Sequence, residues 1–201
     1  MKTHRSQLNR GFSLVEVLVS LSLFIIVLTM GVGSLLVLIS ANAKAQNIQA
    51  AVGNVQFALD SMSREIRTGF AYYCSTSAST NVTGGFEQTN DCDKGVYLSI
   101  IEGGDSLTSS ASNNRLAYRY NSGSRSIERR IGSGSWLPLT DPTVTIDEMH
   151  FSVNDSKTRT QDTSIIQPNV TIYIKGSIAG ISETDASFTL QTTVTKRVLD
   201  L

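Results

Sequence analysis

The order of apolar and polar residues divides the beginning of the chain into three parts. Residues 1–11 are polar and basic, residues 12–41 are almost wholly apolar, and residues 42–70 mix apolar and polar positions. Residues 17–39 carry no charged side chain, and this stretch is longer than the about 20 residues that a helix needs to cross a bilayer. The pattern predicts a long helix whose first half is a hydrophobic transmembrane or assembly segment.

Residues 42–70 are expected to continue this helix as an amphipathic second half. Their apolar side chains recur every three or four positions, which places them on one face of a helix. This face consists of Ile48, Val52, Val55, Leu59, Met62 and Ile66. We expect Gly69 to end the helix and the apolar face to pack against the domain that follows.

Residues 71–201 are predicted to form a β-rich globular domain. Short segments of alternating or β-branched residues are separated by turns rich in Gly, Ser, Asn and Asp. The predicted strands are residues 96–101, 115–120, 126–131, 144–153, 170–178 and 187–194, and the predicted polar loops are residues 75–94, 103–114 and 154–167. The predicted fold class is therefore α+β, with a long N-terminal helix packed on an antiparallel sheet.

The composition gives the chain no overall charge with which to attract nucleic acid or an anionic membrane. Its 201 residues include 17 basic and 17 acidic side chains. Their distribution is uneven, because Lys2, Arg5 and Arg10 lie in residues 1–11, which contain no acid. A basic flank before an apolar segment favours an N-terminus in the cytoplasm and a C-terminal domain outside it.

Glu16 is a single carboxylate at the start of the apolar segment. Burying such a charge in lipid costs a few kcal/mol. A chain that began at Phe12 would carry a positive amino terminus four residues from this carboxylate. In a bundle of such helices, Glu16 of one copy could neutralise the amine of a neighbour, and their attraction at low dielectric would offset the cost of desolvation.

The residues at this boundary are Arg10 followed by Gly11-Phe12-Ser13-Leu14-Val15-Glu16. They resemble the class III signal of type IV pilins and type II secretion pseudopilins. The resemblance implies that a prepilin peptidase removes the leader, residues 1–11, by cleaving between Gly11 and Phe12, and methylates the amine of Phe12. It also implies the lollipop architecture of pilins and three kinds of partner: the prepilin peptidase, other pilin or pseudopilin subunits, and the inner membrane, which the protein leaves for a filament.

Two further segments are similar to minor subunits of these filaments. Residues 59–67 look like the helix end of J-type minor pseudopilins, and residues 188–197 are similar to the last strand of prepilin-like minor subunits. We therefore expect a minor pilin or pseudopilin that is a structural or tip-priming subunit of a type IV pilus or a type II secretion pseudopilus.

A first alternative is a binding module that the filament displays for DNA uptake or adhesion. The only basic cluster outside the leader consists of Arg115, Arg119, Arg125, Arg129 and Arg130. Such a cluster could contact nucleic acid phosphates, although arginines on a hairpin more often form its solvent face.

A second alternative is a secreted, soluble β domain. Ala41-Asn42-Ala43 has the small-residue pattern of a signal peptidase site, and cleavage after Ala43 would release the domain. Against this, the apolar segment is longer than the 7–15 residues usual in signal peptides. A plain single-pass anchor would explain the apolar segment but not Gly11, Phe12 and Glu16.

The chain contains two cysteines, Cys74 and Cys92, and two histidines. These are too few ligands for a zinc site, and we expect neither a metal nor a cofactor. Export would favour a Cys74–Cys92 disulfide, worth about 3 kcal/mol in the chain-entropy model, over two unpaired thiols in one loop. The sequence shows no nucleophile–base pair, supported carboxylate dyad or phosphate-binding loop, so we expect no enzymatic activity.

Overall fold

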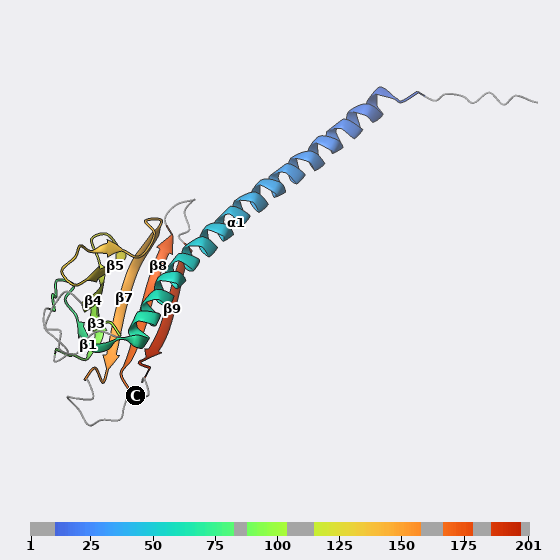
Figure 1. The fold of residues 1–201 in the computed structure, drawn as a ribbon. Coiled ribbons are helices and arrows are strands. Elements are labelled where there is room, and N and C mark those ends of the chain that lie inside the picture. The colour runs from blue at the N-terminus through green and yellow to red at the C-terminus, as the bar shows by residue number, and fades with distance from the viewer. Residues whose placement is uncertain (1–10, 83–87, 104–114, 158–166, 179–185, 198–201) are drawn as a thin grey trace, which may run out of the picture. The chain divides into compact units, whose positions relative to one another are not determined.

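The computed structural model describes residues 11–82, 88–103, 115–157, 167–178 and 186–197. Within these residues the chain forms one helix and nine strands (Figure 1). Residues 1–46 and residues 47–201 form two compact units. The helix, α1 (Leu14–Thr68), begins in the first unit and continues into the second.

The part of α1 in the first unit carries hydroxyl side chains whose hydrogen bonds are made within the helix. Ser20, Ser22, Thr29, Ser34 and Ser40 donate to main-chain oxygens three or four residues earlier, over 2.8–3.0 Å. These hydroxyls need neither water nor another chain as acceptor. The segment can therefore enter an apolar environment without leaving these donors unpaired.

The part of α1 in the second unit packs on the strands through one face. Its buried residues are Ala51, Val55, Ala58, Leu59, Met62 and Ile66. Four of the six residues predicted for this face are among them, whereas Ile48 and Val52 are only half-buried. Ala51 and Ala58 are buried instead, because a methyl side chain lets the helix backbone lie close to the strands.

The strands form two antiparallel sheets. The five-stranded sheet contains, in order, β1 (Phe70–Ser75), β3 (Tyr97–Ile101), β4 (Arg115–Asn121), β5 (Ser126–Ile131) and β6 (Leu137–Pro138). The four-stranded sheet contains β2 (Cys92–Gly95), β7 (Val144–Asn154), β8 (Asn169–Ile178) and β9 (Ala186–Thr195), in that order. Val55 of α1, Tyr118 of β4 and Ile172 of β8 belong to one core cluster, which joins the helix to both sheets. This is the α+β arrangement that the sequence predicts.

The sequence pattern predicts six of the described strands and misses β1, β2 and β6. In β1, Ala71 has a φ of 52° and the pairing with β3 shifts register between Phe70 and Tyr73, so the period-two pattern is broken. The prediction of a polar loop over residues 75–94 is wrong at its end, where β2 pairs with β7. β6 has only two residues, too few for any periodicity.

The C-terminal end of α1 is fixed by hydrogen bonds to carbonyl groups of its last turn. The Gly69 amide donates to the Glu65 oxygen over 2.9 Å, and the Tyr72 hydroxyl donates to the Ile66 oxygen over 2.7 Å. The amide of Arg197 donates to the Arg67 oxygen over 2.9 Å. Because these carbonyls lack partners within the helix, the three bonds end α1 before Gly69 and tie it to β1 and to the chain after β9.

The packing face of α1 gives a first prediction. Met62→Ala should lower the free energy of unfolding by about 2–5 kcal/mol, because the substitution leaves a cavity at a residue that is 0% exposed. Phe57 lies on the same helix and is 71% exposed, so Phe57→Ala should change this free energy by less than about 0.5 kcal/mol. Chemical unfolding of the full chain in detergent measures both variants. Equal effects of the two substitutions would contradict the assigned face.

Candidate functional site

The Gly11–Phe12 bond lies in irregular, exposed backbone immediately before α1. Phe12 is 81% exposed, and the first turn of the helix is closed by a 3.2 Å hydrogen bond from the Val17 amide to the Ser13 oxygen. A Cβ atom added to Gly11 would meet nothing within 4 Å. The packing of the described residues therefore does not require a glycine at this position.

Glu16 lies in the first turn of α1 with its side chain exposed. The free amides of a helix N-terminus carry partial positive charge and favour a carboxylate there. Ser13 and Glu16 also have the Ser-x-x-Glu spacing of a capping box, a local signal that the prediction from charge alone overlooks. The position and the charge of Glu16 are therefore favourable for the start of the helix.

The first half of α1 is apolar around its whole circumference. Every large apolar residue from Phe12 to Ile39 is between 47% and 81% exposed, and one stretch of α1 has a mean hydropathy of 2.6. By length and composition, α1 is the only membrane-crossing candidate in the described part of the chain. A helix that is hydrophobic on every side is stable only when lipid or other helices surround it.

Glu65 links the second half of α1 to the five-stranded sheet. Its carboxylate accepts hydrogen bonds from the Tyr118 hydroxyl on β4 and, over 2.9 Å, from Nη2 of Arg129 on β5. Burial and the bond to Glu65 raise the pKa of Tyr118 above its usual range. Burial opposes the charge of Arg129, but its contact with Glu65 raises the pKa of this guanidinium. Tyr118 stays protonated and Arg129 stays charged, so the link persists at neutral pH.

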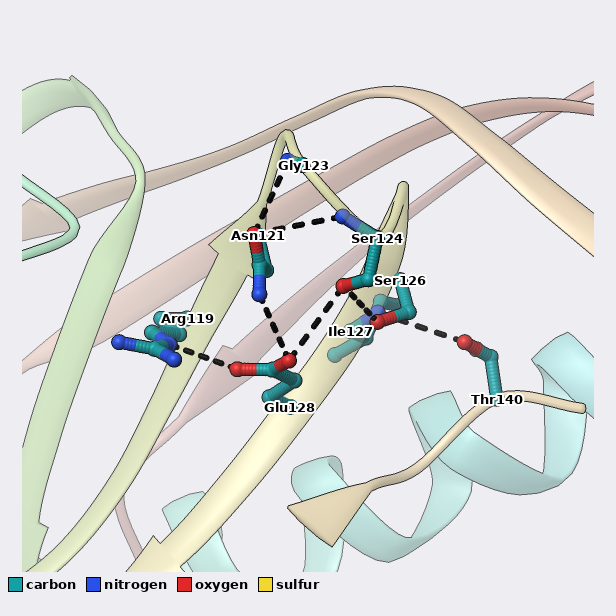
Figure 2. Close-up of polar contacts among 8 residues, drawn as sticks. All are labelled: Arg119, Asn121, Gly123, Ser124, Ser126, Ile127, Glu128 and Thr140. Atoms are coloured by element: carbon teal, nitrogen blue, oxygen red, sulfur yellow. Dashed lines mark hydrogen bonds and ion pairs between the residues drawn. The ribbon is translucent and has the colours of Figure 1, made fainter. Parts of the chain in front are cut away.

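Glu128 organises the hairpin between β4 and β5 (Figure 2). Its carboxylate accepts a 2.7 Å hydrogen bond from Nε of Arg119 and a 2.8 Å hydrogen bond from the side-chain amide of Asn121. The Asn121 side-chain oxygen accepts from the Gly123 amide over 2.9 Å, which shapes the turn. Burial opposes the charged form of Glu128, but these hydrogen bonds outweigh it and lower the pKa of its carboxyl. The turn therefore joins two of the predicted strands, residues 115–120 and 126–131, in one antiparallel hairpin.

The prediction that Arg115 belongs to a solvent-exposed face is wrong. It is 3% exposed, and its guanidinium donates to the Ala71 and Gln88 oxygens over 3.2 and 2.9 Å. Burial lowers the pKa of Arg115 to about 10. Arg115 is buried because this sheet is covered on both faces, by the main core on one and by a smaller cluster around Tyr97 and Ala117 on the other.

The remaining arginines of the basic cluster have partners within the chain. Arg119 pairs with Glu128, Arg125 with Asp147 and Arg129 with Glu65, while Arg130 donates to Asn81 over 2.7 Å. Arg119 and Arg130 also lie over the Trp136 ring, with Cζ atoms 4.2 and 4.5 Å from its centroid. Each of these arginines therefore has a contact within the chain that competes with binding to phosphates or bases, although the side chain of Arg125 is still 52% exposed.

Cys74 and Cys92 form a disulfide that joins β1 to β2, with their Cα atoms 5.5 Å apart. A Cβ atom on Gly95 would collide with both sulfur atoms, so this position requires glycine. Within the described residues no three His, Cys, Asp or Glu side chains are arranged to hold a metal ion.

The chain matches two known protein families. Residues 45–197 match the family described as prepilin peptidase-dependent protein B, and residues 7–32 match the prokaryotic N-terminal methylation motif. No curated protein and no solved structure matches it significantly. The second match contains Gly11, Phe12 and Glu16 and runs into the apolar half of α1.

The Glu128 network gives a pH-dependent prediction. The pKa of Glu128 is below its usual 4.5 in the folded protein, so its stabilising contribution is present above about pH 4.5 and is lost as the pH falls through the folded value. Glu128→Gln should therefore destabilise the protein more at pH 7 than at pH 3. Chemical unfolding of wild type and variant at both pH values measures this; an identical difference at the two values would show that the charge of Glu128 does not stabilise the fold.

Proposed function

Because the chain belongs to the prepilin peptidase-dependent protein B family, we propose that it is a minor subunit of a type IV pilus or a type II secretion pseudopilus, in a structural or tip-priming role. The observation that supports this most is the continuity of the methylation motif, residues 7–32, with a helix that is apolar on every side. The assignment as a minor subunit depends on the similarity of residues 59–67 and 188–197 to minor subunits.

In the proposed sequence of events, the precursor first crosses the inner membrane once. Residues 1–11 lie in the cytoplasm, where their basic residues favour retention, and residues 71–201 lie outside it. The prepilin peptidase then cuts the exposed Gly11–Phe12 bond and methylates the new amine at Phe12. The protein is thus a substrate of an enzyme, and we propose no catalytic activity and no cofactor for it.

In the second step, the first half of α1 moves from lipid into a bundle of similar helices. Both environments are apolar, so the exchange has little hydrophobic cost. The internal hydrogen bonds of residues such as Ser20 and Thr29 are kept in either environment. The direction of transfer then depends on a polar interaction that only the bundle offers.

Glu16 would supply that interaction. Its carboxylate is exposed at the start of the helix, and the structure gives it no ion-pair partner in the described part of the chain. The Phe12 amine of a neighbouring subunit would neutralise it in a low-dielectric surrounding, where such a pair is much stronger than in water. The pair would also fix the axial register of neighbouring helices.

The alternatives receive less support. The arginines that a displayed DNA-binding module would use have partners within the chain. The Ala41-Asn42-Ala43 site of a secreted domain lies inside α1, and the methylation motif has no role in that hypothesis.

The role of Glu16 can be tested with two substitutions. Glu16→Ala removes both the charge and the capping side chain, whereas Glu16→Gln keeps the capping spacing and removes only the charge. If the charge pairs with a neighbouring amine, both variants should be about tenfold or more depleted from sheared filaments, since each 1.4 kcal/mol lost is a factor of ten. Immunoblots of filament and membrane fractions measure this.

Equal amounts of each variant in the membrane fraction are the control for synthesis and insertion. Normal filament incorporation of Glu16→Gln, with loss of Glu16→Ala, would show that Glu16 serves only the start of the helix.

A further inference from the structure

The two sheets end in four edge strands, and three of these are protected within the described residues. β6 has two residues, one of them Pro138. β1 is bonded along its outer side by Asn90, whose oxygen accepts from the Cys74 amide over 3.0 Å. β2 has only four residues, and the disulfide joins it to β1. Short strands, prolines and covering segments are the usual means by which proteins prevent edge-to-edge pairing.

Among the residues that the structure describes, none of these protections is found at the fourth edge strand, β9. It has ten residues, contains no proline and no charged side chain, and pairs with β8 in regular register along its whole length (red in Figure 1). In the described part of the chain β8 is its only neighbour in the sheet. An unprotected strand of this length is a template for another strand.

One hydrogen bond identifies which backbone groups of β9 face away from β8. The Lys196 amide donates to the Pro168 oxygen over 3.0 Å, so the even-numbered residues bond to β8. The alternation of an antiparallel ladder turns the amides and carbonyls of the odd-numbered residues outward. These residues are Ser187, Thr189, Gln191, Thr193 and Thr195.

The next amide in this outward row already has an acceptor. Arg197 donates to the Arg67 oxygen at the end of α1 over 2.9 Å. The helix end therefore closes the row on one side, and the open stretch is residues 187–195. The open edge begins directly beside the last turn of the helix that carries the assembly segment.

The side chains of β9 indicate what kind of strand would fit. Phe188 and Leu190 face the core but remain half-buried, and the Phe188 ring lies over Gly176 of β8. The side chains of the odd-numbered residues lie on the opposite face of the sheet from the core, and they are exposed hydroxyls and an amide. A strand that alternates apolar and uncharged polar residues would cover Phe188 and Leu190 on one face and match Thr189, Gln191 and Thr193 on the other.

We propose that β9 pairs with an extended segment of a second pilin-like subunit of the same filament, which adds a fifth strand to the four-stranded sheet. The proposal rests on the proposed filament function, because assembly holds neighbouring subunits together at high local concentration. An edge without charge selects neither an acidic nor a basic ligand; it selects through backbone pairing. The interaction gives the subunit a specific neighbour outside the helix bundle.

A photoreactive amino acid tests this contact in cells that assemble the filament. It is placed at Thr189 on the edge or, as a control, at Glu148 on β7. Glu148, Lys175 and Thr189 form one row across the sheet. The control probe therefore lies on the same face of the sheet as the Thr189 probe, but two strands away from the edge. The Thr189 probe should yield at least about tenfold more adduct, and mass spectrometry should identify its partner as a subunit with an N-terminal methylation motif. Equal yields, or a partner without the motif, would overturn the proposal.

A second experiment blocks the edge without disturbing β8. The backbone amide of Gln191 points away from β8, so Gln191→Pro removes a donor that the hydrogen-bond ladder between β8 and β9 does not use. Gln191→Thr keeps this donor and is the matched control. Both variants should unfold at similar temperatures, and only Gln191→Pro should be depleted from filaments, by about tenfold; equal incorporation contradicts the proposal.

The two proposals fail in different ways. A wild-type chain that is never recovered in filaments contradicts the filament function and, with it, the partner assigned to β9. Filaments that need Glu16 but accept Gln191→Pro leave the function intact and remove β9 as the contact.

Discussion

The structure depends on one constraint: from Phe12 to Ile39 the helix is apolar on every side and must be surrounded by apolar groups. Lipid and a bundle of like helices meet this requirement almost equally, so hydrophobic burial alone does not choose between them. The choice falls to a few polar groups. The hydroxyls of Ser20, Ser22, Thr29 and Ser34 bond to their own helix and do not depend on the choice. In our proposal, Glu16 gains a partner only where another chain presents an amine.

The second half of α1 meets a different requirement, since only one of its faces is apolar. That face is buried in the core of the second unit, and Glu65, Tyr118 and Arg129 add a polar link to the five-stranded sheet. The arginines that make the hairpin look basic in sequence are used to hold the domain together. The binding surface that we propose is accordingly defined by backbone groups, at the β9 edge, and not by charge.

The parts of the fold with strong periodicity could be predicted from the sequence, and the rest could not for physical reasons. The 3–4 spacing of large apolar residues predicted the second half of α1 and most of its buried face, but it does not reveal that Ala51 and Ala58 are also buried. β1 escapes a period-two search because Ala71 adopts a positive φ and shifts the register. Arg115 was misplaced because alternation assumes one wet face, whereas its sheet is covered on both. The motif around Gly11 and Glu16 could be recognised from the sequence because its signal is local and needs no tertiary contact.

The most direct test of the account is the intact mass and N-terminal sequence of the protein recovered from native membranes or sheared filaments. The account predicts a chain that begins at Phe12 and is heavier by one methyl group than the unmodified sequence from that residue. A chain that begins at Lys44 would contradict it, because the protein would then be a secreted domain without an assembly helix. A chain that still carries residues 1–11 would leave a simple membrane anchor and remove the amine that Glu16 is proposed to bind.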